Sequence, residues 1–256
     1  MAFLSLQGVS YTYPGAEAVE ALRDITFEAE NNEFISVIGP SGCGKSTLLR
    51  LISDLLPVTA GTVTIDGQLA AEARRRREIG FVFQEPALMP WRSALKNVRL
   101  PLEVLNRDDE LGKETAIGLL DLVGLKGFEG KRPDQLSGGM RQRVSIARAL
   151  TYNPFLLLMD EPFGALDQIT RDEMNQELLS IWTRKQSTVI FVTHSIAEAI
   201  FLSDRIVVLS SRPGRIVDIM TVNLPRPRTG DMKRLPVFIE METRLLNALE
   251  GRPRHD

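Results

Sequence analysis

A glycine-rich octapeptide, residues 39–46 (Gly-Pro-Ser-Gly-Cys-Gly-Lys-Ser), is the first segment whose residue types and spacing suit chemistry. It fits the pattern G-x-x-x-x-G-K-[ST], in which glycines let the backbone wrap a phosphate with its N–H groups turned inward. A helix that begins at Lys45 would present its positive end to the same anion. Lys45 is expected to reach the β- and γ-phosphates of a nucleotide, and Ser46 to hold Mg²⁺. The predicted phosphate-binding residues are Gly39, Pro40, Ser41, Gly42, Cys43, Gly44, Lys45, Ser46 and Thr47. This pattern does not by itself separate an ATPase from a GTPase or a kinase.

Two adjacent acids, Asp160 and Glu161, follow the apolar run at residues 155–159. Such a run is typical of a strand buried on both faces of a parallel sheet, and ligands bind beyond the carboxyl ends of such strands. Asp160 is therefore a candidate Mg²⁺ ligand acting through water, and Glu161 a candidate general base for the attacking water. Acids at solvated strand ends are common, so the catalytic interpretation depends on the phosphate loop in the same chain.

A second segment suited to an anion, residues 136–143 (Leu-Ser-Gly-Gly-Met-Arg-Gln-Arg), is called here the signature segment. Ser137 is a good helix N-cap, and Gly138 and Gly139 leave the backbone bare at the start of the helix. One nucleotide needs two such cradles only if they approach it from opposite sides. The segment resembles the signature sequence of the ABC ATPases, and the resemblance extends from about residue 3 to residue 223. In that family, the signature of one subunit closes over the ATP bound by its partner, so the resemblance implies a homodimer around two MgATP.

The resemblance assigns roles to three further residues, in the order that the family has them. Gln84 resembles the glutamine that senses Mg²⁺ and the attacking water. Asp167, at the end of Ala-Leu-Asp, resembles the residue of the D-loop that crosses the dimer interface. His194 resembles the switch histidine that contacts the γ-phosphate. The candidate catalytic residues are thus Lys45, Gln84, Glu161 and His194, and the candidate metal ligands are Ser46, Gln84 and Asp160.

Two positions have more than one interpretation. Tyr13 resembles the aromatic residue that stacks on adenine, but Tyr11 is an alternative, and either ring could belong to the core of a strand. Cys43, inside the phosphate loop, could have a lowered pKa at a helix N-terminus beside a lysine. The preferred interpretation of Cys43 is a small side chain at a variable loop position.

Strands and helices alternate along the chain, which predicts an α/β fold with a parallel core sheet. The predicted strands are residues 26–30, 34–38, 62–65, 80–83, 155–159, 188–193 and 205–209. The predicted helices begin at Lys45, ending before Pro57, and cover residues 113–123 and 235–249. The resemblance adds an N-terminal antiparallel β subdomain and a helical subdomain inserted between about residues 87 and 152. We therefore expect a nucleotide-binding domain over residues 1–224 and a C-terminal helical tail over residues 225–256.

Composition excludes several classes of protein. The chain has 256 residues, a net charge of -2 and one cysteine, so no intrachain disulfide framework is expected, and no nucleic-acid partner is predicted. No run approaches the ~20 apolar residues that span a bilayer, and the first residues lead us to expect no signal peptide. A chromosome-maintenance ATPase would have a long coiled coil between the phosphate loop and the signature segment. A translation or DNA-repair ABC protein would usually have two cassettes and a basic patch.

Residues 84–92 (Gln-Glu-Pro-Ala-Leu-Met-Pro-Trp-Arg), 211–215 and 224–228 are similar to the nitrate, sulfonate and taurine branch of bacterial importers. The resemblance implies two transmembrane permease subunits, an extracytoplasmic solute-binding protein and a position at the cytoplasmic face of the inner membrane. The stretch after Gln84, with Trp91, is then the expected docking surface for a permease helix. Branch members handle small oxyanions and also thiamine precursors, so the cargo stays open.

Overall fold

The computed structural model describes residues 2–15, 17–107 and 109–251. The chain forms two compact units, Met1–Arg76 with Ser187–Asp256, and Arg77–Gln186. The first unit therefore contains both ends of the chain, and the second is one continuous segment. We describe each unit separately.

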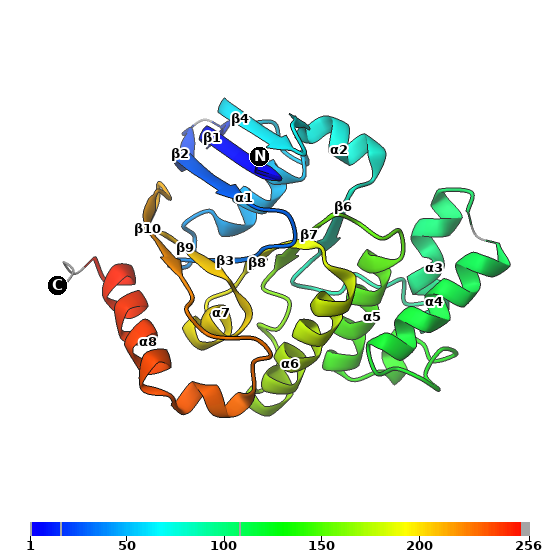
Figure 1. Cartoon of the computed structure of the whole chain (residues 1–256). Coiled ribbons are helices and arrows are strands. Elements are labelled where there is room, and N and C mark those ends of the chain that lie inside the picture. The colour runs from blue at the N-terminus through cyan, green and yellow to red at the C-terminus, as the bar shows by residue number, and fades with distance from the viewer. Residues whose placement is uncertain (1, 16, 108, 252–256) are drawn as a thin grey trace. The chain divides into compact units, whose positions relative to one another are not determined.

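The described residues of the first unit form two sheets and four α-helices (Figure 1). The antiparallel sheet has the order β2-β1-β4-β5. In the other sheet, β3 lies between β8 and β9, parallel to both, and β10 pairs antiparallel with β9. The strands are β1 (Leu4–Tyr13), β2 (Val19–Ala29), β3 (Phe34–Ile38), β4 (Ala60–Ile65), β5 (Gln68–Leu69), β8 (Thr188–Val192), β9 (Arg205–Leu209) and β10 (Ile216–Thr221). The helices are α1 (Lys45–Ile52), α2 (Ala70–Arg76), α7 (Ile196–Leu202) and α8 (Pro236–Leu249), and a 3₁₀ turn covers Gly230–Arg234.

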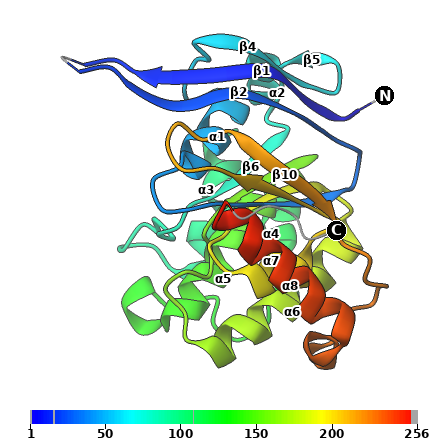
Figure 2. The same cartoon turned by 90° about the vertical axis from the view of Figure 1, so that its left-hand side faces the viewer.

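Helix α1 lies between the two sheets of this unit, where it contacts β2 and β8 (Figure 2). Helix α7 packs on β3, and α8 packs on α7 and β9. All five residues of β3 and all five of β8 are buried, which explains their unbroken apolar sequences. Their parallel register pairs Val37 with Val192, so the chain leaves both strands at the same edge of the sheet.

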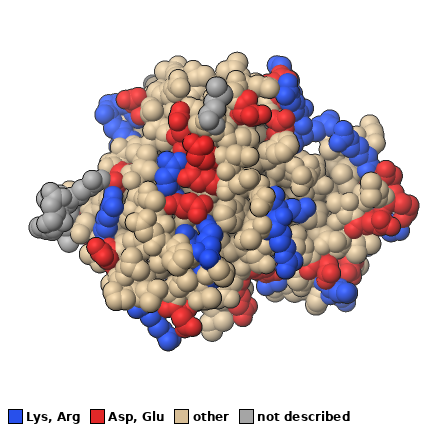
Figure 3. Space-filling view, viewed as in Figure 1, with Lys and Arg blue, Asp and Glu red and all other residues tan. Residues whose placement is uncertain are grey.

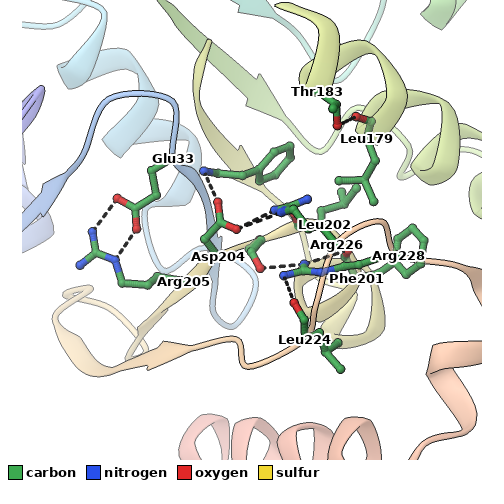
Figure 4. A network of polar contacts seen from close by, with 12 residues as sticks. Glu33, Leu179, Thr183, Phe201, Leu202, Asp204, Arg205, Leu224, Arg226 and Arg228 are labelled. Atoms are coloured by element: carbon green, nitrogen blue, oxygen red, sulfur yellow. Dashed lines mark hydrogen bonds and ion pairs between the residues drawn. The ribbon is translucent and has the colours of Figure 1, made fainter. Parts of the chain in front are cut away.

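The C-terminal tail is fixed to the α7–β9 corner by two arginines (Figure 4). The guanidinium of Arg228 donates from Nη1 to three carbonyls at the C-terminal end of α7, at 2.8–3.1 Å, and burial lowers its pKa to about 10. Arg226 Nη2 donates to Asp204 Oδ1 at 2.7 Å, while Asp204 Oδ2 accepts from the N–H of Phe34 at 2.9 Å. Positively charged side chains are stabilising at the C-terminal end of a helix, where the carbonyl groups lack partners within the helix. Residues 226–228, which the sequence offers only as a family resemblance, therefore anchor the tail.

The described residues of the second unit form two parallel strands and four α-helices. These are β6 (Ile79–Val82), α3 (Ala94–Val104), α4 (Glu110–Leu122), α5 (Gly138–Leu150), β7 (Leu156–Asp160) and α6 (Gln168–Lys185), with a 3₁₀ turn at Pro133–Gln135. Helices α3, α4 and α5 pack against one another, and α5 also packs on β6. Because α5 joins the helical cluster to the strand pair, it is the central element of this unit.

Several predicted bounds were wrong. The helix at Lys45 ends at Ile52 rather than near Pro57, because the chain turns at Asp54, where φ is 55°. Strand β7 begins at Leu156, and Phe155 is 57% exposed rather than buried. Strand β2 begins at Val19, well before residue 26, because it pairs with β1. No strand was predicted at β1 because bulges interrupt its pairing and hide its alternation.

None of the helices in the described ranges combines the length and the apolar character that a membrane crossing needs. On the face shown in Figure 3, Lys and Arg side chains are interspersed with Asp and Glu side chains. Among the described residues of this face, the two signs of charge therefore largely offset one another.

Candidate functional site

The phosphate loop connects β3 to α1 in the first unit. Gly44, the N-cap of α1, has a φ of 103°, and a Cβ there would lie 2.7 Å from Leu22 Cδ2, so the loop requires glycine at this position. Lys45 is only 6% exposed, and its Nζ donates to the carbonyls of Gly39 at 2.9 Å and Pro40 at 3.2 Å. The loop therefore holds the ammonium group against its own backbone. This places a positive charge at the N-terminal end of α1, as an anion site requires.

The structure distinguishes the two tyrosines of β1. Tyr11 is 6% exposed and belongs to the core, whereas Tyr13 is half-buried. The hydroxyl of Tyr13 lies 2.9 Å from Thr47 Oγ1, in the first turn of α1. The rings of Tyr11 and Tyr13 pack edge to face, with their centroids 4.8 Å apart. Tyr13 is therefore beside the phosphate loop with part of its ring accessible, which favours it over Tyr11 for adenine stacking.

His194 follows β8 and is exposed on a fixed stretch of backbone. The hydroxyl of Thr193, which is 2% exposed, donates to the carboxylate of Glu198 and accepts from the N–H of Ser195 at 3.0 Å. Ser195 in turn caps α7 by accepting from the N–H of Glu198 at 3.3 Å. The β3–β8 register brings His194 and Gly39 to the same sheet edge, each two residues beyond a paired valine. The structure thus groups His194 with the phosphate loop.

In the second unit, Gln84 and the acid pair lie at one edge of the β6–β7 pair. The register pairs Val82 with Met159, so Gln84 and Glu161 each follow a paired residue by two positions. Asp160 is 7% exposed at the end of β7. Glu161 has a φ of 43°, in the left-handed region that non-glycine residues rarely adopt. Strained backbone of this kind is typical of functional positions.

The signature segment begins α5, as predicted. Ser137 is the N-cap and accepts from the N–H of Met140 at 3.2 Å. Asp167 is the N-cap of α6, and hydrogen bonds from the backbone and hydroxyl of Thr170 lower its pKa. A Cβ on Gly139 would lie 3.3 Å from Thr170 Cγ2, so the starts of α5 and α6 are adjacent. The second unit therefore brings together the signature glycines and Asp167.

One part of the phosphate-loop surroundings was missed. The β9–β10 loop passes directly beside it: a Cβ on Gly214 would lie 2.1 Å from the carbonyl oxygen of Cys43. Arg212 Nε donates to the carbonyl of Gly42 at 3.3 Å. The sequence offers residues 211–215 only as a resemblance to the importer branch. These residues closely follow β9, which pairs with β3, and this position is the feature that could have indicated their closeness to the phosphate loop.

A phosphate loop on a parallel sheet, with an acid pair at a buried strand end, defines a P-loop nucleotide hydrolase. The ABC transporter family matches residues 22–164, more than half of the chain. The chain is 43% identical over 248 residues to an aliphatic sulfonates import ATP-binding protein of Bacillus cereus (strain ATCC 10987 / NRS 248), covering 96% of each chain. It is 44% identical over 241 residues to a nitrate import ATP-binding protein of Synechocystis sp. (strain ATCC 27184 / PCC 6803 / Kazusa), covering 92% of this chain and 90% of that protein.

Among solved structures, a dimeric ATP-binding cassette in a post-hydrolysis state with ADP and Pi is similar, with a TM-score of 0.76 and 36% identity, covering 87% of this chain and 100% of that chain. The chain belongs to the ABC transporter family. It is an ATP-binding subunit with the ATPase activity of that family.

Proposed function

We propose that the chain energises an importer for a small anion such as a sulfonate, taurine or nitrate, as a homodimer bound to two permease subunits at the cytoplasmic face of the membrane. A separate extracytoplasmic protein would deliver the cargo. The relatives named for import of sulfonates, bicarbonate, nitrate and taurine support the branch. An importer of another small solute, such as a thiamine precursor, is the alternative, and a non-transport ABC ATPase is a more distant one.

The residues fit MgATP. Ser46, Asp160 and Gln84 offer hydroxyl, carboxylate and amide oxygens, the hard donors that Mg²⁺ prefers, and bound Mg²⁺ would offset the phosphate charge. Lys45 would bind the β- and γ-phosphates, and Tyr13 would stack on the adenine. Glu161 would take a proton from the attacking water, and His194 would contact the γ-phosphate. Ser137, Gly138, Gly139 and Asp167 would act on the nucleotide of the partner subunit.

The observation that carries the transport role is an exposed, rigid segment after Gln84. We call residues 86–91 the docking segment. Trp91 is 68% exposed, so its side chain is not packed within a core. Asn97, fully buried, accepts from the N–H of Met89 at 2.8 Å and donates to its carbonyl at 3.2 Å. A large apolar side chain held outward on fixed backbone is typical of a protein interface.

Composite active sites make turnover depend on dimerisation. The specific ATPase activity of the isolated subunit is therefore expected to rise with protein concentration, because the signature segment of one subunit completes the site of the other. Phosphate release measured over a dilution series, beside sedimentation at the same concentrations, checks this. Constant specific activity from a demonstrated monomer would contradict the homodimer.

Trp91→Ala is expected to leave the melting temperature and basal ATPase of the free subunit unchanged, while weakening permease association by about 2 kcal/mol, or roughly 30-fold. In proteoliposomes containing the permease, ATPase stimulation and uptake should fall together. Leu111→Ala is the control, because Leu111 is 70% exposed on α4, outside the docking segment. A destabilised, inactive free Trp91 variant would reject the docking role.

Testing taurine, alkanesulfonate, nitrate and a thiamine precursor with the intact transporter identifies the cargo class.

A further inference from the structure

The docking segment is hydrogen-bonded directly to α5. Arg148, in the last turns of this helix, donates from Nη1 to the carbonyl of Ala87 at 2.9 Å and from Nη2 to the carbonyl of Pro86 at 2.6 Å. Charged donors of this kind make stronger hydrogen bonds than neutral ones, and the planar guanidinium fixes both carbonyls at once. Arg148 is half-buried, and burial lowers its pKa. The positive charge of Arg148 is therefore partly removed from water, and its hydrogen bonds to the docking segment keep it in this position.

A second contact ties α5 to the chain just before Gln84. Gln142, which is 2% exposed, donates from Nε2 to the carbonyl of Phe83 at 3.4 Å. Helix α5 therefore holds the backbone on both sides of Gln84, through Gln142 before it and Arg148 after it. The same helix begins with the signature glycines, and ten residues at about 1.5 Å each put Arg148 roughly 15 Å from Gly138.

The backbone at the point of contact is strained. Ala87 has a φ of 44°, in the left-handed region that alanine rarely adopts. Its carbonyl is one of the two that Arg148 binds. Residues in such conformations persist only where their surroundings hold them, and they are frequent in segments that switch. Arg148 is therefore one of the contacts that can hold Ala87 in this conformation.

We propose that Arg148 is a positioning residue that fixes the docking segment to the helix carrying the signature, so that displacing the segment moves the signature end of α5. The proposal rests on the proposed function, since the signature acts only in a composite ATP site. It implies that Arg148 affects turnover and not ATP affinity. The phosphate loop and Tyr13 belong to the other unit, whereas α5 and the docking segment belong to this one.

The test uses the full-length free subunit with Arg148→Met. Amide hydrogen exchange is expected to quicken in residues 83–92 and also in the first turn of α5, residues 138–141. The Kd for ATP should stay within about twofold, while kcat falls by roughly tenfold, the effect of losing one or two charge-assisted hydrogen bonds. Arg148→Lys should recover part of the kcat, because an ammonium can still donate to a carbonyl but lacks the fork.

Two further variants separate positioning from general destabilisation. Arg143→Met removes another half-buried arginine of α5. The hydrogen bonds of Arg143 go to the carbonyl of Val123, Glu177 and Met174 Sδ, so this variant should leave exchange in residues 83–92 unchanged. Ala87→Gly removes the strain without removing a side-chain contact of Arg148. Because both carbonyls that Arg148 binds remain in Ala87→Gly, exchange in the same two regions should stay at the wild-type rate or slow. Arg148→Lys keeps the test open if Arg148→Met does not fold, since it should quicken exchange in both regions to a smaller degree.

Unchanged exchange in the first turn of α5 in Arg148→Met, or in Arg148→Lys where Arg148→Met does not fold, would overturn the proposal. An increase in the Kd for ATP that matches the fall in kcat would overturn it too. These measurements need no permease. If Trp91→Ala had no effect in the transporter while the exchange pattern held, the docking role would fail and the link between the segment and α5 would stand.

Discussion

Replacing Glu161 with glutamine is expected to lower ATP turnover by about 10²–10⁴-fold while ATP still binds. Glutamine keeps the size of the side chain and one of its two oxygens, but the neutral amide cannot take a proton from water. Lys45, Ser46 and Asp160 are unchanged, so the contacts expected to bind MgATP remain. Because hydrolysis would no longer separate the subunits, the variant should accumulate as an ATP-bound dimer.

Steady-state phosphate release gives the turnover, and size-exclusion chromatography with and without ATP gives the assembly. Glu173→Gln is the matched control, since Glu173 is an exposed acid on α6 and its loss should leave turnover near the wild-type value. Near-normal hydrolysis by Glu161→Gln would assign the base elsewhere, with His194 as the next candidate.

Gly214→Ala is expected to weaken ATP binding by at least tenfold. A Cβ at this position would lie 2.1 Å from the carbonyl oxygen of Cys43 and 3.0 Å from Leu22 Cδ2. The first of these contacts is with the backbone of the phosphate loop, which must move to relieve it. Overpacking of this kind costs about 1–3 kcal/mol, and a 1.4 kcal/mol loss in binding is tenfold in Kd.

Calorimetric titration with ATP gives the Kd, and a thermal melt shows how much of the effect is general. Gly130→Ala serves as the control, because a Cβ on Gly130 would meet nothing within 4 Å. If Gly214→Ala bound ATP as the wild type does, the β9–β10 loop would not be a support for the phosphate loop.

The phosphate loop, the start of α1 and strands β3 and β9 could be predicted from the sequence, because each follows from a local pattern: glycines before a lysine, or a short apolar run. The sequence alone could not decide between Tyr11 and Tyr13, because the two side chains share one face of a strand and differ only in the residues that pack over them. The packing of Gly214 against the phosphate loop could not be predicted either, because it depends on the close approach of two backbone segments that are far apart in the sequence. The roles of the individual site residues stay predictions until the variants are measured.

The outward position of Trp91 also gives the molecule an optical reporter. The chain has two tryptophans, and the other, Trp182, is half-buried on α6. In a Trp182→Phe background, the emission spectrum would come from Trp91 alone, at the long wavelengths of a hydrated indole. Covering that ring by a partner would shift the emission to shorter wavelengths, so association could be followed in real time without an attached dye.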